Sequence, residues 1–146
     1  LIWEVKVNNA AQARHMDHRY TWYNTSSPDG NPGTVGSTSS CGNTLGGNAC
    51  NTQSYTQAVN AAGLCAASDW RMPTRKELQG IVDYGRFAPA IDGTYFVNTP
   101  PSSLVWSGSP SAGNSGYAWG VNFDDGDVDD LIRSFSYRAR LVRGGQ

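Results

Sequence analysis

The stretch from 69 to 78, with the sequence DWRMPTRKEL, constrains the fold of this chain more than any other. Thr74 precedes Glu77 by three residues, which is the spacing of a capping box. In that motif each side chain accepts a hydrogen bond from a backbone N–H that the first helical turn leaves unpaired. Pro73 keeps Met72 extended, so the chain enters the helix abruptly. The stretch therefore predicts a helix that begins just after Thr74.

The residues that follow predict how far this helix extends. Leu78, Ile81 and Val82 stand at positions i, i+3 and i+4, which form one apolar face of a helix. Gly85 stands where a left-handed C-terminal cap is expected. We therefore predict a helix over about 75–84.

A second helix is predicted over about 52–62. Thr52 is a suitable N-terminal cap, and Gly63 is a suitable end. Its apolar face is expected to consist of Tyr55, Val59 and Ala62.

The chain has 146 residues, enough for one domain with its own hydrophobic core, and we expect a single domain over 1–146. Its 17 glycines and its mean hydropathy of -0.47 indicate a polar, loop-rich protein. The formal net charge is -1 and there is no run of Lys or Arg, which argues against general binding to nucleic acid or to a membrane surface. No apolar run approaches the roughly 20 residues of a membrane-spanning helix.

Apolar and polar residues alternate in the first stretch, LIWEVKV, which is typical of a strand. No initiator Met or signal peptide precedes it. We interpret the chain as a fragment of a longer exported precursor whose targeting segment is missing.

The three cysteines are Cys41, Cys50 and Cys65. If 52–62 is helical, Cys50 and Cys65 lie at its opposite ends, roughly 20 Å apart at 1.5 Å per residue. A disulfide requires Cα atoms within about 7 Å. We therefore prefer a Cys41–Cys50 disulfide with Cys65 as a buried thiol, and three reduced cysteines are the alternative. The spacing fits no familiar zinc pattern.

The first third of the chain is polar. Residues 20–23 are expected to form a short aromatic strand, and the Ser-, Gly- and Asn-rich 24–49 is either a linker or, as we prefer, a long loop within one domain. Three titratable residues lie close together before that strand: His15, Asp17 and His18. Metal binding would need a further ligand that their spacing does not supply, so a solvated loop is the simpler interpretation.

Short strands dominate the C-terminal part, at 104–107, 117–123, 128–132 and 137–143. Asp125-Gly126 is typical of a hairpin turn. Alternation in the second of these strands places four residues on one face: Tyr117, Trp119, Val121 and Phe123. The predicted fold class is α+β, with two helices and small antiparallel sheets. The predicted core consists of Trp3, Trp22, Trp70, Leu78, Val82, Trp106, Trp119, Val121 and Leu141.

Several of these segments together resemble a known family. They are Trp3–Lys6, Tyr20–Asn24, Asn60–Cys65, Asp69–Leu78, Val105–Ser107, Ala118–Trp119, Val121–Phe123 and Arg140–Gln146. This combination resembles the Lcl C-terminal-like domain of bacterial surface proteins, named for a collagen-like adhesin, over essentially the whole chain. The resemblance implies a C-type-lectin-like fold, akin to that of formylglycine-generating enzymes. It also implies an extracellular location on the bacterial cell surface, with anchoring through the missing N-terminal segment.

The resemblance also implies ligand binding. The collagen-like adhesin binds sulfated glycosaminoglycans as a trimer. Other members are variable proteins of diversity-generating retroelements, in which error-prone copying at adenines rewrites chosen codons near the C-terminus. The segment between Trp106-Ser107 and Arg140-Leu141 suits such a variable protein, because most of its residue types are reachable by changing adenines in an Asn codon. Ordinary turn chemistry is the alternative explanation.

The predicted ligand-binding residues are Ser109, Asn114, Ser115, Tyr117, Asp124, Asp125, Asp127, Asp129, Asp130, Leu131, Arg133, Ser134, Phe135, Ser136 and Arg138. We expect Tyr117 and Phe135 to supply rigid contact area, and the aspartates and Arg138 to supply polar specificity. We also expect Arg133 and Arg138 to be exposed there, whereas Arg140 and Arg143 would be structural and paired with carboxylates.

Five aspartates crowd 124–130, and Asp125, Asp127 and Asp129 would share one face of a strand. Such a cluster can hold Ca²⁺, but it lacks the Gly and distal Glu of a helix-loop-helix calcium loop. We prefer a solvated acidic patch and no cofactor, with calcium as the alternative. The patch would repel a sulfated polysaccharide, which needs a basic groove, so the glycosaminoglycan role does not transfer cleanly.

No nucleophile-plus-base pattern, phosphate loop or metal cluster stands out, so we predict a protein that is not an enzyme. The kinship to formylglycine-generating enzymes is one of fold, and those enzymes need late cysteines, whereas none follows Cys65. The expected partner is a protein or glycan on another cell or host surface, with no nucleic acid and no membrane insertion. An oligomer is allowed. The alternatives are a fixed glycan-binding adhesin, a trimerisation module and an enzyme on the same fold.

Overall fold

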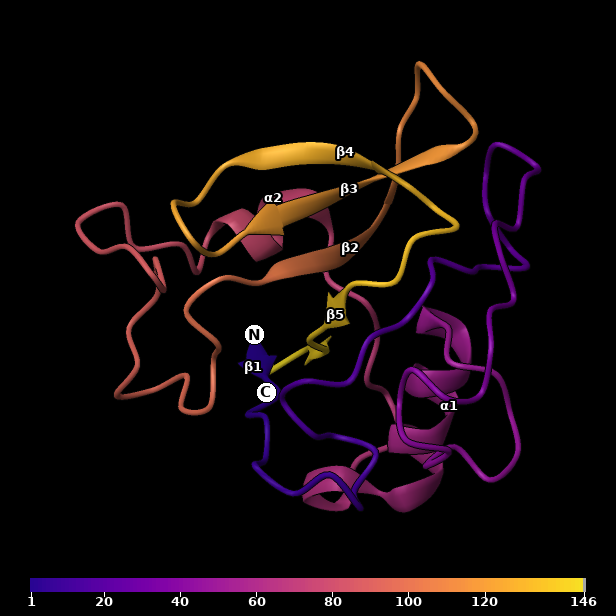
Figure 1. The fold of residues 1–146 in the computed structure, drawn as a ribbon, viewed down its shortest axis with the longest axis horizontal. Coiled ribbons are helices and arrows are strands. Elements are labelled where there is room, and N and C mark those ends of the chain that lie inside the picture. Colours follow the sequence, from indigo (N-terminus) through magenta and orange to yellow (C-terminus); the bar gives the residue numbers. More distant parts are fainter. Residues whose placement is uncertain (146) are drawn as a thin grey trace.

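The computed structural model describes residues 1–145 and has an α+β fold with two small sheets (Figure 1). The helices are α1 (Thr52–Ala62), a short 3-10 turn (Leu64–Ala66) and α2 (Arg75–Gln79). The strands are β1 (Ile2–Trp3), β2 (Leu104–Pro110), β3 (Tyr117–Asn122), β4 (Val128–Ile132), β5 (Arg138–Ala139) and β6 (Val142–Arg143). No helix among the described residues is long and apolar enough to cross a membrane.

The larger sheet has the strand order β4-β3-β2-β5. The pairs β2–β3 and β3–β4 are antiparallel, as expected from the hairpin pattern. The pair β2–β5 is parallel, with Trp106 opposite Ala139, so the expectation of purely antiparallel sheets was wrong. After β4 the chain crosses from one edge of the sheet to the other, and this crossover makes β5 run in the same direction as β2.

The smaller sheet joins the two ends of the chain. β1 pairs with β6 in antiparallel register, and the N- and C-termini lie close together in Figure 1. The strand predicted over 137–143 is divided in two, because the backbone of Leu141 exchanges hydrogen bonds with Glu4. The N–H of Glu4 donates to the carbonyl of Leu141 (2.9 Å), and the N–H of Leu141 donates to the Glu4 carboxylate (2.9 Å).

Helix α1 matches its predicted range, and Gly63 ends it in the left-handed conformation (φ 66°). The N-cap is Asn51, one residue before the predicted Thr52, and its side chain accepts from the N–H of Ser54 (2.8 Å). Tyr55 and Val59 are buried as expected, whereas Ala62 is exposed.

The capping box of α2 is confirmed, because the Thr74 and Glu77 side chains each accept from the other residue's backbone N–H. The helix ends at Gln79 rather than near 84, and Gly80, not Gly85, is its C-cap. The N–H of Asp83 instead donates to the carbonyl of Ala90 (2.9 Å). This bond closes a loop after the helix, while Ile81 and Val82 still pack on the core.

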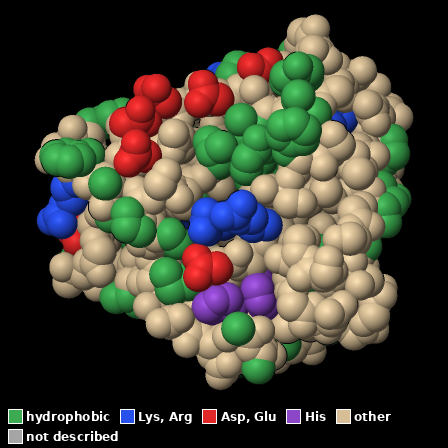
Figure 2. All heavy atoms as spheres, in the orientation of Figure 1, with side chains coloured by type: hydrophobic (Ala, Val, Ile, Leu, Met, Phe, Trp, Pro, Cys, Tyr) green, Lys and Arg blue, Asp and Glu red, His purple; other side chains and the backbone are tan. Residues whose placement is uncertain are grey.

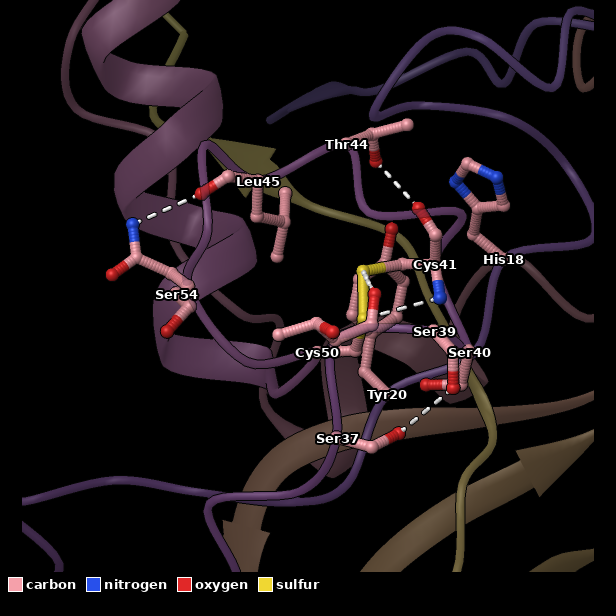
Figure 3. Close-up of a disulfide and its surroundings, with 12 residues drawn as sticks. His18, Tyr20, Ser37, Ser39, Ser40, Cys41, Thr44, Leu45, Cys50 and Ser54 are labelled. Carbon is pink, nitrogen blue, oxygen red and sulfur yellow. Dashed lines mark hydrogen bonds between the residues drawn. A yellow bond between two sulfur atoms is a disulfide. The ribbon is translucent and has the colours of Figure 1, made fainter.

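The predicted Cys41–Cys50 disulfide is present, and both residues are buried beside Tyr20 and Leu45 (Figure 3). Cys65 is exposed, so its prediction as a buried thiol was wrong. The left-handed end of α1 at Gly63 leads into a tight turn in which Leu64 packs against the core and Cys65 faces solvent.

The core has three parts, centred on Tyr20 and Tyr55, on Leu78 and Val121, and on Trp22 with Trp106. Most of the predicted core residues are buried. The exceptions, which are half-buried, are Trp3, Val82 and Trp119. The guanidinium of Arg75 lies 4.7 Å from the centre of the Trp119 ring, so this tryptophan is covered by a cation rather than by the core.

A buried polar network, which no sequence pattern indicated, connects the segment after β1 with α1 and the C-terminal strands. The Glu4 carboxylate accepts from Lys6 Nζ (3.0 Å) and from the Tyr55 hydroxyl, and Arg140 donates to the Glu4 carbonyl (2.6 Å). Burial lowers the pKa of Lys6 to about 8, against the opposing effect of Glu4. We call Glu4, Lys6, Tyr55 and Arg140 the Glu4 network.

Candidate ligand-binding face

The candidate face is built on the β3–β4 hairpin and the segment that follows it. Tyr117 lies opposite Ile132, and Trp119 lies opposite Asp130. Cross-strand partners point to the same side of a sheet, so Asp130 shares a side with Trp119, and Asp129 points to the other side. The side chains of Asp129 and Asp130 are both exposed, because β4 is the edge strand.

The predicted Asp125-Gly126 turn closes this hairpin. Gly126 has φ +93°, and its N–H donates to the carbonyl of Asn122 (2.7 Å). A Cβ at Gly126 would stand 2.6 Å from the Val82 side chain, so a larger residue does not fit. Asp125 and Asp127 lie in this turn rather than in a strand, so the expectation that they share a strand face with Asp129 was wrong.

The predicted site residues differ in exposure. The exposed ones are Asn114, Ser115, Asp125, Asp127, Asp129, Asp130, Ser134 and Phe135. The half-buried ones are Ser109, Tyr117, Asp124, Leu131, Ser136 and Arg138. Figure 2 shows red acidic side chains along the upper edge of the molecule, where Figure 1 places β4, with green apolar side chains beside them. The structure thus places acidic and apolar groups next to each other on one face.

Arg133 is the clear exception, because only 2% of its surface is exposed. Its guanidinium donates to the carbonyls of Tyr117 (2.9 Å) and Asn31 (2.7 Å), and to the Asp29 carboxylate (2.5 Å). It also lies 4.2 Å from the centre of the Trp22 ring. The expectation that Arg133 is exposed at the site was wrong, since it fixes the loop around Asn31 to the end of β4.

This ion pair also affects Asp29. The hydrogen bond from Arg133 holds the pKa of the Asp29 carboxyl well below its usual range. The sequence offered no indication of this pairing, because Asp29 and Arg133 are separated by most of the chain.

Arg138 is half-buried in β5, at the opposite edge of the sheet from β4, so the expectation that it is exposed at the site was wrong. It donates to the carbonyl of Met16 (3.1 Å) and to Asp17 (3.2 Å), and Asp17 is 3.6 Å from His15. In Figure 2 the two purple histidines lie beside a red acidic group and a blue cationic group on this face. Within residues 1–145, no three or more His, Cys, Asp or Glu side chains are arranged to hold a metal ion. The prediction that no cofactor is needed stays a prediction.

The other two arginines of the C-terminal segment, Arg140 and Arg143, are structural. Arg143 pairs with Asp69 (2.6 Å), as expected. Arg140 is buried and donates to the carbonyl of Glu4 and to the Thr99 hydroxyl (2.9 Å), so its direct partners are not carboxylates as predicted.

The fold and this face define a loop-rich α+β domain that presents an acidic and aromatic surface on a four-stranded sheet. The model of the family described as the Lcl C-terminal domain matches residues 1–143, and the chain belongs to that family. Membership points to a surface domain of the ligand-binding or adhesion type. Neither the curated proteins nor the solved structures that were compared with the chain gave a match.

Proposed function

We propose that this protein is a ligand-binding domain displayed on the bacterial cell surface, with a C-type-lectin-like fold and no catalytic activity. Its diversified contact face consists of exposed residues of 107–138, as in the variable protein of a diversity-generating retroelement. Its ligand is a protein or glycan on another cell or host surface. The observation that carries this proposal is the separation of exposed from buried positions along the C-terminal segment.

The buried positions of that segment are fixed by specific contacts, some of them with distant parts of the chain. Trp106 donates its ring N–H to the carbonyl of Tyr20 (2.7 Å), and the hydroxyl of Ser107 donates to the carbonyl of Trp119 (2.6 Å). Ala118 and Ala139 are almost fully buried. Substitution would leave unpaired polar groups at Trp106 or Ser107, and a larger side chain would overpack the core at Ala118 or Ala139. These positions therefore suit an invariant framework.

The exposed positions have few such contacts. Asp125 uses its side chain only within its own turn, where it accepts from the N–H of Asp127 (3.0 Å). Phe135 is 53% exposed, and its ring centre lies 6.4 Å from that of Tyr137. Surface substitutions of this kind usually change stability little, which is what a diversified face requires.

The chemistry of the face favours some ligands over others. The exposed aspartates attract basic or hydroxyl-rich groups, and Phe135 with the half-buried Tyr117 offers rigid aromatic contact area. The acidic groups repel sulfates. A basic protein surface or a neutral glycan therefore suits this face better than a sulfated glycosaminoglycan.

The test of diversification is genetic. The coding DNA for residues 104–146 and the few kilobases downstream should contain a near-copy of this segment that differs only where the copy carries adenine. The differing codons would name the variable residues directly. Absence of a near-copy would overturn the diversified face and leave a fixed adhesin domain.

The test of the contact face is a pair of matched variants. Phe135→Ala should abolish binding of the fluorescently labelled domain to host cells, whereas Tyr95→Ala, an exposed aromatic outside 107–138, should not. Flow cytometry measures binding, and thermal melting should be similar for both variants. Equal binding by the two variants would remove Phe135 from the contact face.

A further inference from the structure

A cavity of about 320 Å³ lies outside the residues of the proposed contact face. It is open to solvent and is lined by the loop at Trp22–Asn24, the first two turns of α1, and residues 71–72 with Gly108. This volume is at the lower end of the range of small-molecule pockets, about 300–1,000 Å³. It suits a single small ring rather than a long chain.

The apolar part of the lining is held in place by hydrogen bonds. The Trp22 ring N–H donates to the carbonyl of Ser107 (3.0 Å), so the indole is held in place. The N–H of Gly108 donates to the carbonyl of Pro73 (2.7 Å). A Cβ at Gly108 would stand 3.0 Å from the Cβ of Met72, which shows how closely these two segments approach.

One wall consists of polar side chains from α1. Gln53, Thr56 and Gln57 stand at i, i+3 and i+4, so they share one face of the helix. The Gln53 carbonyl accepts from the N–H (2.9 Å) and the hydroxyl (3.0 Å) of Thr25, which leaves its NH₂ group as a donor. Gln57 is exposed, and its amide offers both a donor and an acceptor.

The side chain of Arg71 also lines the cavity. Glu77 holds its guanidinium through two hydrogen bonds, of 2.7 and 2.8 Å. The same pairing lowers the pKa of Glu77 to about 2, so the ion pair persists at neutral pH. Arg71 is the one charged residue that lines the cavity, and Glu77 compensates it.

We propose that this cavity binds one neutral saccharide unit, such as a terminal hexose or N-acetylhexosamine of a glycan. Each sugar hydroxyl both donates and accepts, and the Gln57 amide can do the same. Gln53 offers its NH₂ group as a donor, and the Thr56 hydroxyl can accept while it donates to the carbonyl of Thr52 (2.7 Å). Because Glu77 compensates the charge of Arg71, the cavity has no net charge that would favour a sulfated or carboxylated sugar. No acidic residue lines the cavity, so sugar binding there needs no calcium.

The site is also pre-organised, because Trp22, Gln53 and Arg71 are each held by contacts outside the cavity. Little ordering is needed on binding, which favours affinity for a small ligand. Of the residues that line the cavity, Gly108 lies within 107–138 but is half-buried, so diversification of the exposed residues of that segment leaves the lining unchanged.

The experiment is an NMR titration of the ¹⁵N-labelled domain with glucose, galactose, mannose, N-acetylglucosamine and N-acetylgalactosamine, each with and without EDTA. At least one sugar should give saturable shifts of the Gln53 and Gln57 side-chain amides that EDTA does not alter. Gln57→Ala should weaken that binding about tenfold, which corresponds to the loss of one or two hydrogen bonds. Gln79→Ala, an exposed glutamine of α2 outside the cavity, is the matched control.

Three results would overturn the proposal. The first is the absence of a saturable shift with all five sugars. The second is an equal effect of Gln57→Ala and Gln79→Ala on sugar binding. The third is loss of the sugar response in Phe135→Ala, because that would place the sugar on the contact face instead.

Discussion

The carboxylate of Glu4 and those of the β3–β4 hairpin have opposite environments. Glu4 is 1% exposed and accepts hydrogen bonds from Lys6, from Tyr55 and from the N–H of Leu141. Asp125, Asp127 and Asp129 are exposed in the β3–β4 hairpin. Glu4 connects segments from both ends of the chain, whereas the aspartates contact solvent.

The difference shows how one chain can combine a fixed framework with an exchangeable surface. A buried charge that loses its partner leaves other buried groups unpaired, which is costly. When an exposed charge is replaced, its neighbours are solvated by water instead, so the effect on stability is small. Substitutions should therefore have very different effects in the two regions.

The largest effect is expected for Glu4→Gln. The amide keeps only one acceptor oxygen, and it leaves Lys6 and Arg140 without their nearest negative charge. We expect a loss of about 3–5 kcal/mol in the free energy of unfolding, measured by urea denaturation. Asp125→Asn is the control. A loss below about 1 kcal/mol would show that the Glu4 network does not stabilise the framework.

Arg133→Met tests whether the C-terminal segment contains both framework residues and surface residues. The variant loses two hydrogen bonds to backbone carbonyls and the packing on Trp22. We expect a loss of about 2–3 kcal/mol, because hydrogen bonds from a charged group are strong. Arg138→Met, at a half-buried position, should cost less in the same denaturation experiment. A larger loss of stability for Arg138→Met than for Arg133→Met would show that Arg133 is not a framework residue.

The smallest effect is expected when Asp125, Asp127 and Asp129 are all replaced by Asn. Removing neighbouring like charges should raise the melting temperature slightly, by no more than about 2 °C at low salt. The difference should disappear at high salt, because salt screens exposed charges. A marked drop in the melting temperature would mean that these carboxylates have structural partners, and the comparison with Glu4 would fail.

Features that depend on neighbouring residues were predictable from the sequence. The capping box at Thr74 and Glu77, the turn at Asp125-Gly126 and the end of α1 at Gly63 are all present. The Cys41–Cys50 disulfide was also predictable, because it closes a short loop. The exposed aspartates of the candidate face were expected for the same reason, since polar turn residues usually face solvent.

Features that depend on distant residues were missed. Two more local features were also missed, namely the tight turn after Gly63 that exposes Cys65 and the early end of α2 at Gln79. Half-buried Trp119 was assigned to the core because alternation does not reveal that Arg75 covers it. The cavity between Gln57 and Arg71 was not predicted, because it forms only when α1 meets segments far along the chain.

The sequence by itself determined the local elements, the disulfide, the α+β class and the resemblance to the Lcl C-terminal domain family. Only the tertiary structure decided which charges are buried. Glu4 pairs with Tyr55, and Arg133 pairs with Asp29, across long stretches of chain. Burial of a charge depends on partners that the fold brings together, and those partners need not be near in sequence.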